Sequence, residues 1–589
     1  MIQTGATPTN PSQKKPSWQA ARVMIALATL LFLSLSLSAH AQSANLAWAK
    51  RAGSNTLDDG MGVAVDTNRN VYVTGYFKNM ATFGAGEPNP TQLTALGQDV
   101  FVAKYAPGGG LLWVRQARSQ AGWGTSIGVD DAGNCYVVGY FSLTITFAFG
   151  QPEQVALSAA ANDLFLAKYD SDGNFLWAKQ AGGTFGEFGQ GIAVDGLGNC
   201  YVTGRYGSNP STFGAGEPNE TALAGLPISG GLNNGEDVFI AKYDTNGLLQ
   251  WAKSAGGATG NQGVGIDLDA AGNCYVTGRY STSSTFGPGE PNQTTLTSPL
   301  GPSFEIFVAK FSPNGNLAWV RGGQGQAEHD QGTAIAVDAA GNSYATGTYR
   351  SIAPFGGQLN QIQIDNGGAE DVFIVKHDTD GNRQWVKMVV GPDGEFSVGI
   401  ALDSAGSPYL TGYGFFLVFG AGEENEVSLA GIGSNDVFLA KYGTDGLLQW
   451  ARFDGGTGDD RGQALAIDAT GGIHVVGRIF QTATFGSGQA NQTAITSAGG
   501  SDIFIAKFLP VVAIQPATFV GFEVLPNGNP GMTISGSPLK TYTIRRSPTI
   551  VGPSWNGAGN VLTDAQGRGV FEDADPALLF PAFYQAVGN

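Results

Sequence analysis

The chain has 589 residues, a formal net charge of −17 and only 13% charged residues. An acidic balance of this size argues against binding to nucleic acid or to an anionic membrane surface, because both need clustered Lys and Arg. Four histidines and three cysteines leave little material for a zinc site, a catalytic triad or a disulfide framework.

The first predicted element is an export signal over residues 1–41. Three basic residues precede an apolar run over residues 23–37, and Ala39–Ala41 supplies a small-x-small cleavage pattern. We therefore expect the mature chain to begin at Gln42, with an uncleaved N-terminal anchor as the alternative. No later segment approaches about 20 apolar residues, so we expect no transmembrane segment after cleavage. The expected location is secreted, extracellular or at the cell surface, with the periplasm as the other exported destination.

A long internal repeat follows the signal. Seven tryptophans in strand-like runs are spaced 64 to 74 residues apart: Trp48, Trp113, Trp177, Trp251, Trp319, Trp385 and Trp450. Three further runs recur between them, exemplified by Gly62–Asp66, Asn70–Phe77 and Asp99–Tyr105. These runs are rich in β-branched and aromatic residues and are bounded by Gly, Asn and Asp, as strands are. Four antiparallel strands repeated seven times predict an all-β, seven-bladed β-propeller over residues 42–510.

The two ends of the repeat region predict how the ring closes. The first Trp strand, over residues 45–51, has no third strand before it, and the last third strand, over 502–508, has no Trp strand after it. The N-terminal strand can therefore complete the seventh blade. That closure would remove the exposed edge strands that an open array must protect.

The repeat resembles a known family. Its run Gly-x-Ala-Val-Asp-x-x-Gly-Asn-x-Tyr-Val-Thr-Gly, followed by Asp-x-Phe-x-Ala-Lys-Tyr and Leu-x-Trp-Ala-Lys, is similar to the bacterial SBBP-type propeller repeat over residues 45–508. The resemblance implies a propeller fold and a bacterial source. It implies little about activity, because the family is mostly known as a fold and a shared fold does not establish a shared function.

Residues 511–589 depart from the repeat in composition. Alternating apolar positions such as Tyr542 and Ile544 indicate short strands, and the length suits a small domain. We expect a C-terminal β-sandwich-like module. Attachment to a surface, sugar binding and capping of the ring are the alternative roles for it.

Residues that recur in every blade are most simply explained by the fold. The Asp that ends each first strand, such as Asp269, and the Lys near the end of each third strand, such as Lys310, recur in all seven repeats. We interpret the Asp as a turn cap and expect each Lys to pair with an acid within or between blades, because every blade meets the same packing problem. Function is expected where the blades differ.

The variable connections of the predicted propeller share one face, here called the loop face. The residue after the glycine that closes each second strand should approach this face, as should two residues of the blade-to-blade connections. The candidate ligand-binding residues are Tyr76, Trp123, Tyr140, Arg205, Arg279, His329, Tyr413 and Arg478. Aromatic and Arg side chains are enriched at binding surfaces, and a glycan or anionic polymer could use them for stacking and bidentate contacts. Rim packing and local ion pairing are the alternative.

The position that enters each innermost strand is acidic in five of the seven repeats: Asp58, Glu187, Asp330, Glu395 and Asp460. If these carboxylates converged at the mouth of the central channel, they would repel one another unless a cation or a proton intervened. Calcium prefers such oxygen ligands, so a calcium site is one hypothesis. The other is that each carboxylate caps its own turn.

These features favour a non-catalytic binding scaffold that recognises a glycan, a protein or a surface component through its loop face. A calcium-dependent hydrolase or lyase with its site at the channel mouth is the enzymatic alternative, although only His329 and Asp330 suggest an acid–base pair. A structural adhesin or matrix protein is the third hypothesis. No catalytic residue is predicted, and calcium is the one cofactor considered.

Overall fold

The computed structural model describes residues 44–207, 210–225, 235–257, 260–298, 303–323, 330–350, 370–392 and 394–510, and most strands of the C-terminal segment. Over these residues the chain is all-β, with antiparallel strand pairing and no helix. No helix that could span a membrane is therefore found in the described part. The predicted signal segment and His329 lie outside the described residues.

Two compact units divide the chain; one comprises Ser43–Val511, and the other includes Val512–Asn589. The C-terminal unit contains two antiparallel sheets of three strands. They are β34(Thr518–Val524), β35(Pro530–Ser535) and β38(Arg568–Glu572), and β37(Asn556–Leu562), β36(Thr541–Ser547) and β39(Phe583–Gly588). Ile534 of one sheet and Ile544 of the other are fully buried.

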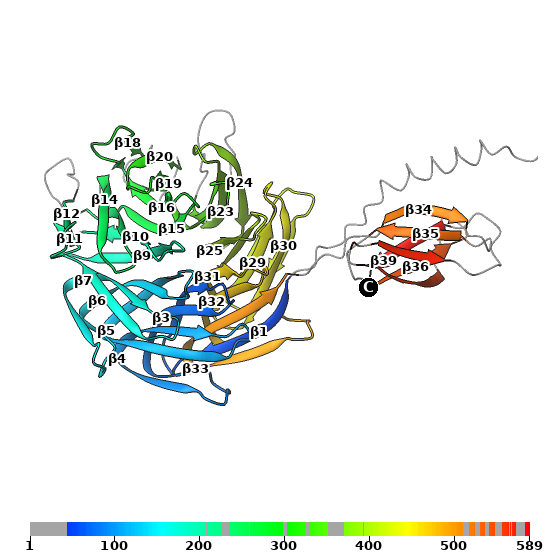
Figure 1. Ribbon diagram of the computed structural model, residues 1–589, viewed down its shortest axis with the longest axis horizontal. Helices are drawn as coiled ribbons and strands as arrows, with labels where there is room; N and C mark the ends of the chain where they lie inside the picture. Colours follow the sequence, from blue (N-terminus) through cyan, green and yellow to red (C-terminus); the bar gives the residue numbers. More distant parts are fainter. Residues whose placement is uncertain are drawn as a thin grey trace, which may run out of the picture. The chain divides into compact units, whose positions relative to one another are not determined.

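In the first unit, a four-stranded antiparallel motif recurs with each of the sequence repeats, here numbered 1 to 7 (Figure 1). The strands are β1(Asn45–Ala52), β2(Asp59–Val65), β3(Val71–Phe83), β4(Thr91–Tyr105), β5(Leu111–Val129), β6(Cys135–Phe147), β7(Val155–Tyr169), β8(Phe175–Ala181), β9(Glu187–Val194), β10(Cys200–Tyr206), β11(Ser211–Phe213), β12(Thr221–Leu223), β13(Asp237–Tyr243), β14(Leu249–Gly257), β15(Gln262–Leu268), β16(Cys274–Ser281), β17(Ser283–Phe286), β18(Thr294–Thr297), β19(Phe304–Phe311), β20(Leu317–Gly322), β21(Gln331–Val337), β22(Ser343–Tyr349), β23(Asp371–His377), β24(Arg383–Val390), β25(Phe396–Leu402), β26(Pro408–Gly414), β27(Phe416–Phe419), β28(Val427–Ala430), β29(Asp436–Tyr442), β30(Leu448–Gly456), β31(Arg461–Ile467), β32(Ile473–Phe485) and β33(Thr493–Leu509). β5 ends one repeat and begins the next.

The first strand of each repeat lines a central cavity of about 470 Å³. The lining strands are β2, β5, β9, β15, β21, β25 and β31. Small residues let their backbones approach: a Cβ added at Gly265 would lie 2.8 Å from the Cα of Ala334 on the neighbouring strand. The strands can converge on one centre because these positions carry almost no side chain.

The N-terminal strand joins the last repeat. β1 pairs antiparallel with β33, with Asn45 opposite Leu509 and Ala52 opposite Ile503, and the two strands lie side by side in Figure 1. The indole N–H of Trp48 also donates to the carbonyl of Pro107 in repeat 1, at 3.1 Å. β1 therefore contacts both the last and the first repeat.

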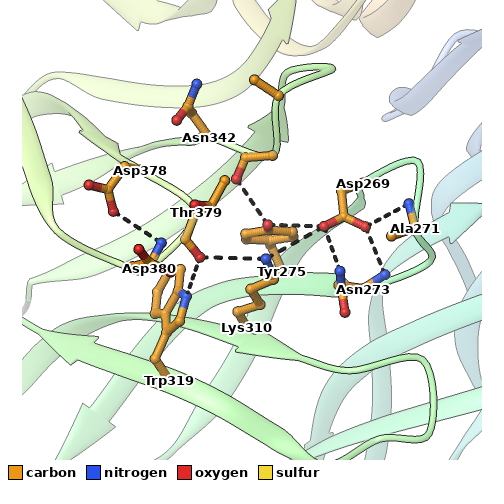
Figure 2. A network of polar contacts seen from close by, with 12 residues as sticks. Asp269, Ala271, Asn273, Tyr275, Lys310, Trp319, Asn342, Asp378, Thr379 and Asp380 are labelled. Carbon is orange, nitrogen blue, oxygen red and sulfur yellow. Dashed lines mark hydrogen bonds and ion pairs between the residues drawn. The ribbon is translucent and has the colours of Figure 1, made fainter.

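Consecutive repeats are tied together by a recurrent polar network, which Figure 2 shows between repeats 4 and 5. Asp269 accepts hydrogen bonds from the backbone N–H and the side-chain amide of Asn273, at 2.9 and 2.7 Å. The Tyr275 hydroxyl donates to the Gly341 carbonyl of the next repeat at 2.9 Å. Lys310 lies 4.9 Å from the Tyr275 ring centroid and 3.6 Å from Asp269. The repeated Asp and Lys are thus turn-capping and ion-paired residues, as predicted.

The hairpin between the second and third strands forms a second tie. In repeat 4, β17 pairs with β14 of the preceding repeat, with Thr285 opposite Gly256. At the hairpin tip, Glu290 accepts from the Leu317 N–H at 2.6 Å and forms an ion pair with Lys253 at 2.9 Å. The hairpin therefore bridges the outer strands of two repeats and covers part of their edges.

Each second strand carries a glycine opposite a bulge of the first strand: Gly75, Gly139, Gly204, Gly278, Gly347, Gly412 and Gly477. In repeat 3 the register shifts between Thr203 and Gly204, and a Cβ added at Gly204 would lie 1.9 Å from the carbonyl oxygen of Phe188. Only glycine permits this approach of two backbones. Such a bulge bends the first strand at the point where the chain reaches the cavity.

We predict that Gly204→Ala lowers the free energy of unfolding by about 3 kcal/mol, because the added methyl group must displace backbone. Denaturant midpoints measure the change. The control is Gly108→Ala, where an added Cβ meets nothing within 4 Å. Equal midpoints for the two variants would show that the bulge is not constrained as described.

Candidate functional site

The residue after each bulge glycine lies opposite the residue that begins the innermost strand. The seven opposed pairs are Tyr76–Asp59, Tyr140–Trp123, Arg205–Phe188, Arg279–Gln262, Thr348–Gln331, Tyr413–Phe396 and Arg478–Arg461. We call these pairs the mouth belt, because they stand at the end of the strands that line the cavity. Most of the belt side chains are half-buried, so they combine fixed positions with access to solvent.

Seven of the eight predicted ligand-binding residues belong to this belt; the eighth, His329, lies outside the described residues. Ligand binding by them stays a prediction. Sequence reasoning missed their partners on the first strand, notably Phe188, Phe396 and Arg461. The available signal was their position, which directly follows the acidic position and varies in chemistry from repeat to repeat.

One sector of the belt is an aromatic row that leads to a guanidinium. Trp123 stacks on Tyr140 with ring centroids 4.7 Å apart and planes 19° apart. Tyr140 meets Phe188 of the next repeat edge-on at 4.9 Å. The Arg205 guanidinium lies 4.3 Å from the Phe188 centroid. These contacts join repeats 2 and 3 with geometries typical of favourable aromatic and cation–π pairs.

Another sector is dominated by ion pairs. Arg461 lies 2.9 Å from Asp459, while Arg478 lies 3.1 Å from Asp459 and 3.5 Å from Asp59. Burial raises the pKa of Asp59 to about 7, against the attraction of the Arg478 charge. Arg461 also lies over the ring of Tyr413, at 4.5 Å from its centroid. In this sector the arginines are held by acids of the same surface.

The five candidate calcium ligands are buried, and hydrogen bonds tie four of them to local backbone. Asp58, Asp330 and Asp460 accept from the N–H groups of Lys78, Arg350 and Phe480, at 2.8, 2.9 and 2.9 Å. Glu187 accepts from the Gly183 N–H at 3.0 Å and from the Ser211 hydroxyl at 2.7 Å. Glu395 lies beside the backbone of Gly391.

These bonds fix the blade-to-blade loop against the hairpin of the same repeat, which is the turn-capping role. Among the described residues, no group of three or more His, Cys, Asp or Glu is placed to hold a metal ion. A calcium site formed by these five carboxylates stays a prediction.

Carboxyl groups of adjacent repeats also meet beneath the belt. Burial raises the pKa of Asp460 to about 7, and the nearby charge of Asp436 adds to the shift. Burial likewise raises the pKa of Asp58 to about 6 and that of Asp330 to about 8. At the equivalent junction of repeats 3 and 4, the amide of Asn261 donates to Asp237 at 3.3 Å. A protonated acid can supply the same donor at the other junctions.

These shifts predict that the protein is more stable at mildly acidic pH. The folded state keeps protons that the unfolded state, with an Asp pKa of 3.8, releases. The stability from this proton uptake is fully present below that value and is lost as pH rises through the folded pKa values of about 6 to 8. Thermal melts should therefore shift to lower temperature between pH 5 and pH 8.

Asp460→Asn separates this effect from the general repulsion of a chain with net charge −17. The amide mimics the protonated acid, so the variant should melt higher than the native chain at pH 8 and depend less on pH. Glu153→Gln, an exposed position, removes the same charge as a control. If both variants change the melts equally, net charge explains the pH dependence and the buried pair does not.

The fold and its repeated motif define the class: an all-β protein built from repeated four-stranded antiparallel motifs. Residues 47–76 and 176–205 match the family of SBBP β-propeller repeats. The chain therefore carries SBBP-type β-propeller repeats at these two places, which is consistent with an SBBP-type repeat protein.

Two curated proteins are similar to the chain over part of its length. The uncharacterized WD repeat-containing protein L264 of Acanthamoeba polyphaga mimivirus is 25% identical over 80% of this chain and 39% of its own length. The regulatory protein FlaEY of Caulobacter vibrioides is 27% identical over 28% of this chain and 16% of its own length. The chain thus spans less than half the length of either relative.

A comparison with solved structures aligns the crystal structure of the V. cholerae biofilm matrix protein Bap1 over 92% of this chain and 90% of that chain. The identity is 11% and the TM-score is 0.17, so this likeness carries no inference.

Proposed function

We propose that the chain is an exported, closed seven-bladed β-propeller that acts as a non-catalytic binding scaffold, with the mouth belt as its ligand-binding surface. Two observations support the closed ring: first strands from all seven repeats line one cavity, and β1 pairs with β33. In this arrangement β1 supplies the fourth strand of the seventh blade. The ligand is a glycan or protein presented outside the cell.

Closure by β1 predicts the effect of its removal. A chain that begins at Gly53 exposes the edge of β33 and loses the Trp48 contact with repeat 1. Unpaired strand edges recruit other chains, so this variant should melt at lower temperature and self-associate in size-exclusion chromatography. A chain that begins at Ser43 is the control. Identical melts and elution for the two chains would exclude a structural role of β1 in the ring.

One observation carries the binding proposal: chemistry varies around the mouth belt, while its structural surroundings repeat. The bulge glycine, the turn-capping Asp and the paired Lys recur in every repeat, because each repeat must fold. Opposite the residue that follows each glycine, however, the belt carries Trp, Phe, Gln, Asp or Arg. Variable, half-exposed aromatic and Arg side chains held on rigid strands are what a recognition surface requires.

The cavity below the belt favours binding over catalysis. Its lining is mostly Gly, Ala, Val, Ile, Thr and Gln, with Asp267 as the one acid among the lining residues. Both carboxylate oxygens of Asp267 accept backbone N–H groups, from Leu268 at 2.8 Å and Val337 at 2.7 Å. A carboxylate held in this way on both oxygens is poorly placed to exchange protons with a substrate.

The test compares apolar truncations at the two ends of the repeats. Trp123→Ala with Tyr413→Ala alters the belt, whereas Leu112→Ala with Leu176→Ala alters exposed positions at the start of outer strands. Binding to a glycan array and to isolated cell-surface material is measured for both. The belt variant should bind at least tenfold more weakly while it still unfolds in one cooperative transition, because aromatic anchors dominate binding energy. Unaltered binding by the belt variant would place the binding surface elsewhere.

A further inference from the structure

The belt contains two pairs of neighbouring arginines that differ in how their charges are balanced. Arg461 and Arg478 share two carboxylates, those of Asp459 and Asp59. Among the described residues, the one acid that forms an ion pair with either Arg205 or Arg279 is Glu236, which lies 3.3 Å from Arg205. In the described part of the chain, each arginine of the first pair has an ion-pair partner, whereas in the second pair Arg205 alone has one.

Neutral groups hold Arg279 in place. Its Nε donates to the Gly260 carbonyl at 3.3 Å, and its Nη1 donates to the amide oxygen of Gln331 at 3.2 Å. Its guanidinium lies 4.4 Å from the ring centroid of Phe304. No ion pair of Arg279 is found in the described part of the chain. The guanidinium is thus positioned without being neutralised.

Two nearby cations with one acid favour an incoming anion. Burial lowers the pKa of Arg279, the positive charge of Arg205 lowers it further, and the negative charge of Glu236 opposes the shift. The Nε of Arg205 is buried and makes no hydrogen bond within the described residues. A carboxylate placed between the two side chains would relieve their repulsion and accept charge-assisted hydrogen bonds.

The aromatic row leads to the same place. Trp123, Tyr140 and Phe188 follow one another across repeats 2 and 3 and end under Arg205. Rings of this kind offer apolar faces to the C–H groups of a pyranose. An acidic peptide carries its carboxylates on flexible stems and has no such face, whereas a uronic acid polymer has both a flat apolar face and a carboxylate in every sugar.

We propose that this sector of the mouth belt binds an acidic polysaccharide, with a sugar carboxylate held between Arg205 and Arg279 and adjacent sugars stacked along the row from Phe188 to Trp123. The inference rests on the proposed function and adds the ligand class. Elsewhere the chain, with net charge −17, repels a polyanion, so binding is confined to this sector and weakens as salt is raised.

The experiment titrates the full chain with three probes: oligogalacturonate, its methyl ester of equal length, and poly-glutamate. Isothermal titration calorimetry at low and at physiological salt gives the affinities. The native chain should bind oligogalacturonate at least tenfold more tightly than the ester. Arg205→Gln with Arg279→Gln should abolish that difference. Arg69→Gln with Arg321→Gln, at exposed positions outside the mouth belt, changes the net charge equally and should leave it intact.

Arg205→Lys with Arg279→Lys keeps both charges and should lose most of the preference, because Lys cannot offer a bidentate fork. This variant also serves if the Gln variant does not fold. Equal binding of acid and ester, or equal binding of poly-glutamate, would overturn the acidic-polysaccharide inference while leaving the mouth belt as a binding surface. Absence of binding to all three probes would also overturn it, and array binding by the native chain would then test the proposed function separately.

Discussion

The close approach of two backbones at each bulge glycine is the constraint on which the rest of the repeat unit depends. At Gly204 the first-strand carbonyl occupies the space where a side chain would begin. This contact accompanies a bulge where the first strand reaches the cavity, and Phe188 lies opposite Arg205 at the mouth. Because the same glycine recurs in all seven repeats, the same geometry presents a pair of side chains from each.

The repeat separates residues that build the fold from residues that remain available for recognition. The polar groups of Asp269, Tyr275 and Lys310 form hydrogen bonds and ion pairs within their repeat and with the next one. The buried acids at the start of the innermost strands accept hydrogen bonds from backbone N–H groups of their own repeats. Side chains with such fixed partners have little capacity left for a ligand. The belt differs because its side chains contact aromatic rings and amides, and because some of its arginines have no ion-pair partner among the described residues.

Much of this arrangement could be predicted from the sequence. The strands, their order and the Asp–Lys pairing follow from the spacing of a repeat whose every copy faces the same burial and turn requirements. The position of Tyr140 and Arg205 could be predicted because it directly follows the glycine. Their partners Trp123 and Phe188 come from the preceding strand, and a bulge shifts that pairing, which the spacing of residues alone does not reveal.

The direction of buried side chains was harder to predict. Five carboxylates at equivalent positions suggested a common site, yet Asp58, Asp330 and Asp460 each hydrogen-bond to backbone of their own repeat. Whether an acid points into a channel or back to a loop depends on where a few N–H groups lie after folding. Equivalent residues of the repeats lie at the same level along their strands. They form one site only if their side chains also point toward each other.

Net charge bears on ligands that need many cations at once and says little about local sites. A total of −17 still argues against ligands that need many cations at once, because affinity for a nucleic acid grows with the number of neutralised phosphates. It does not exclude a site that needs one charge in the right geometry. Arg205 and Arg279 share one acid, while Arg461 and Arg478 share two. The surplus positive charge at Arg205 and Arg279 is small. It suits a polymer that presents isolated carboxylates between apolar sugar faces better than it suits a dense polyanion.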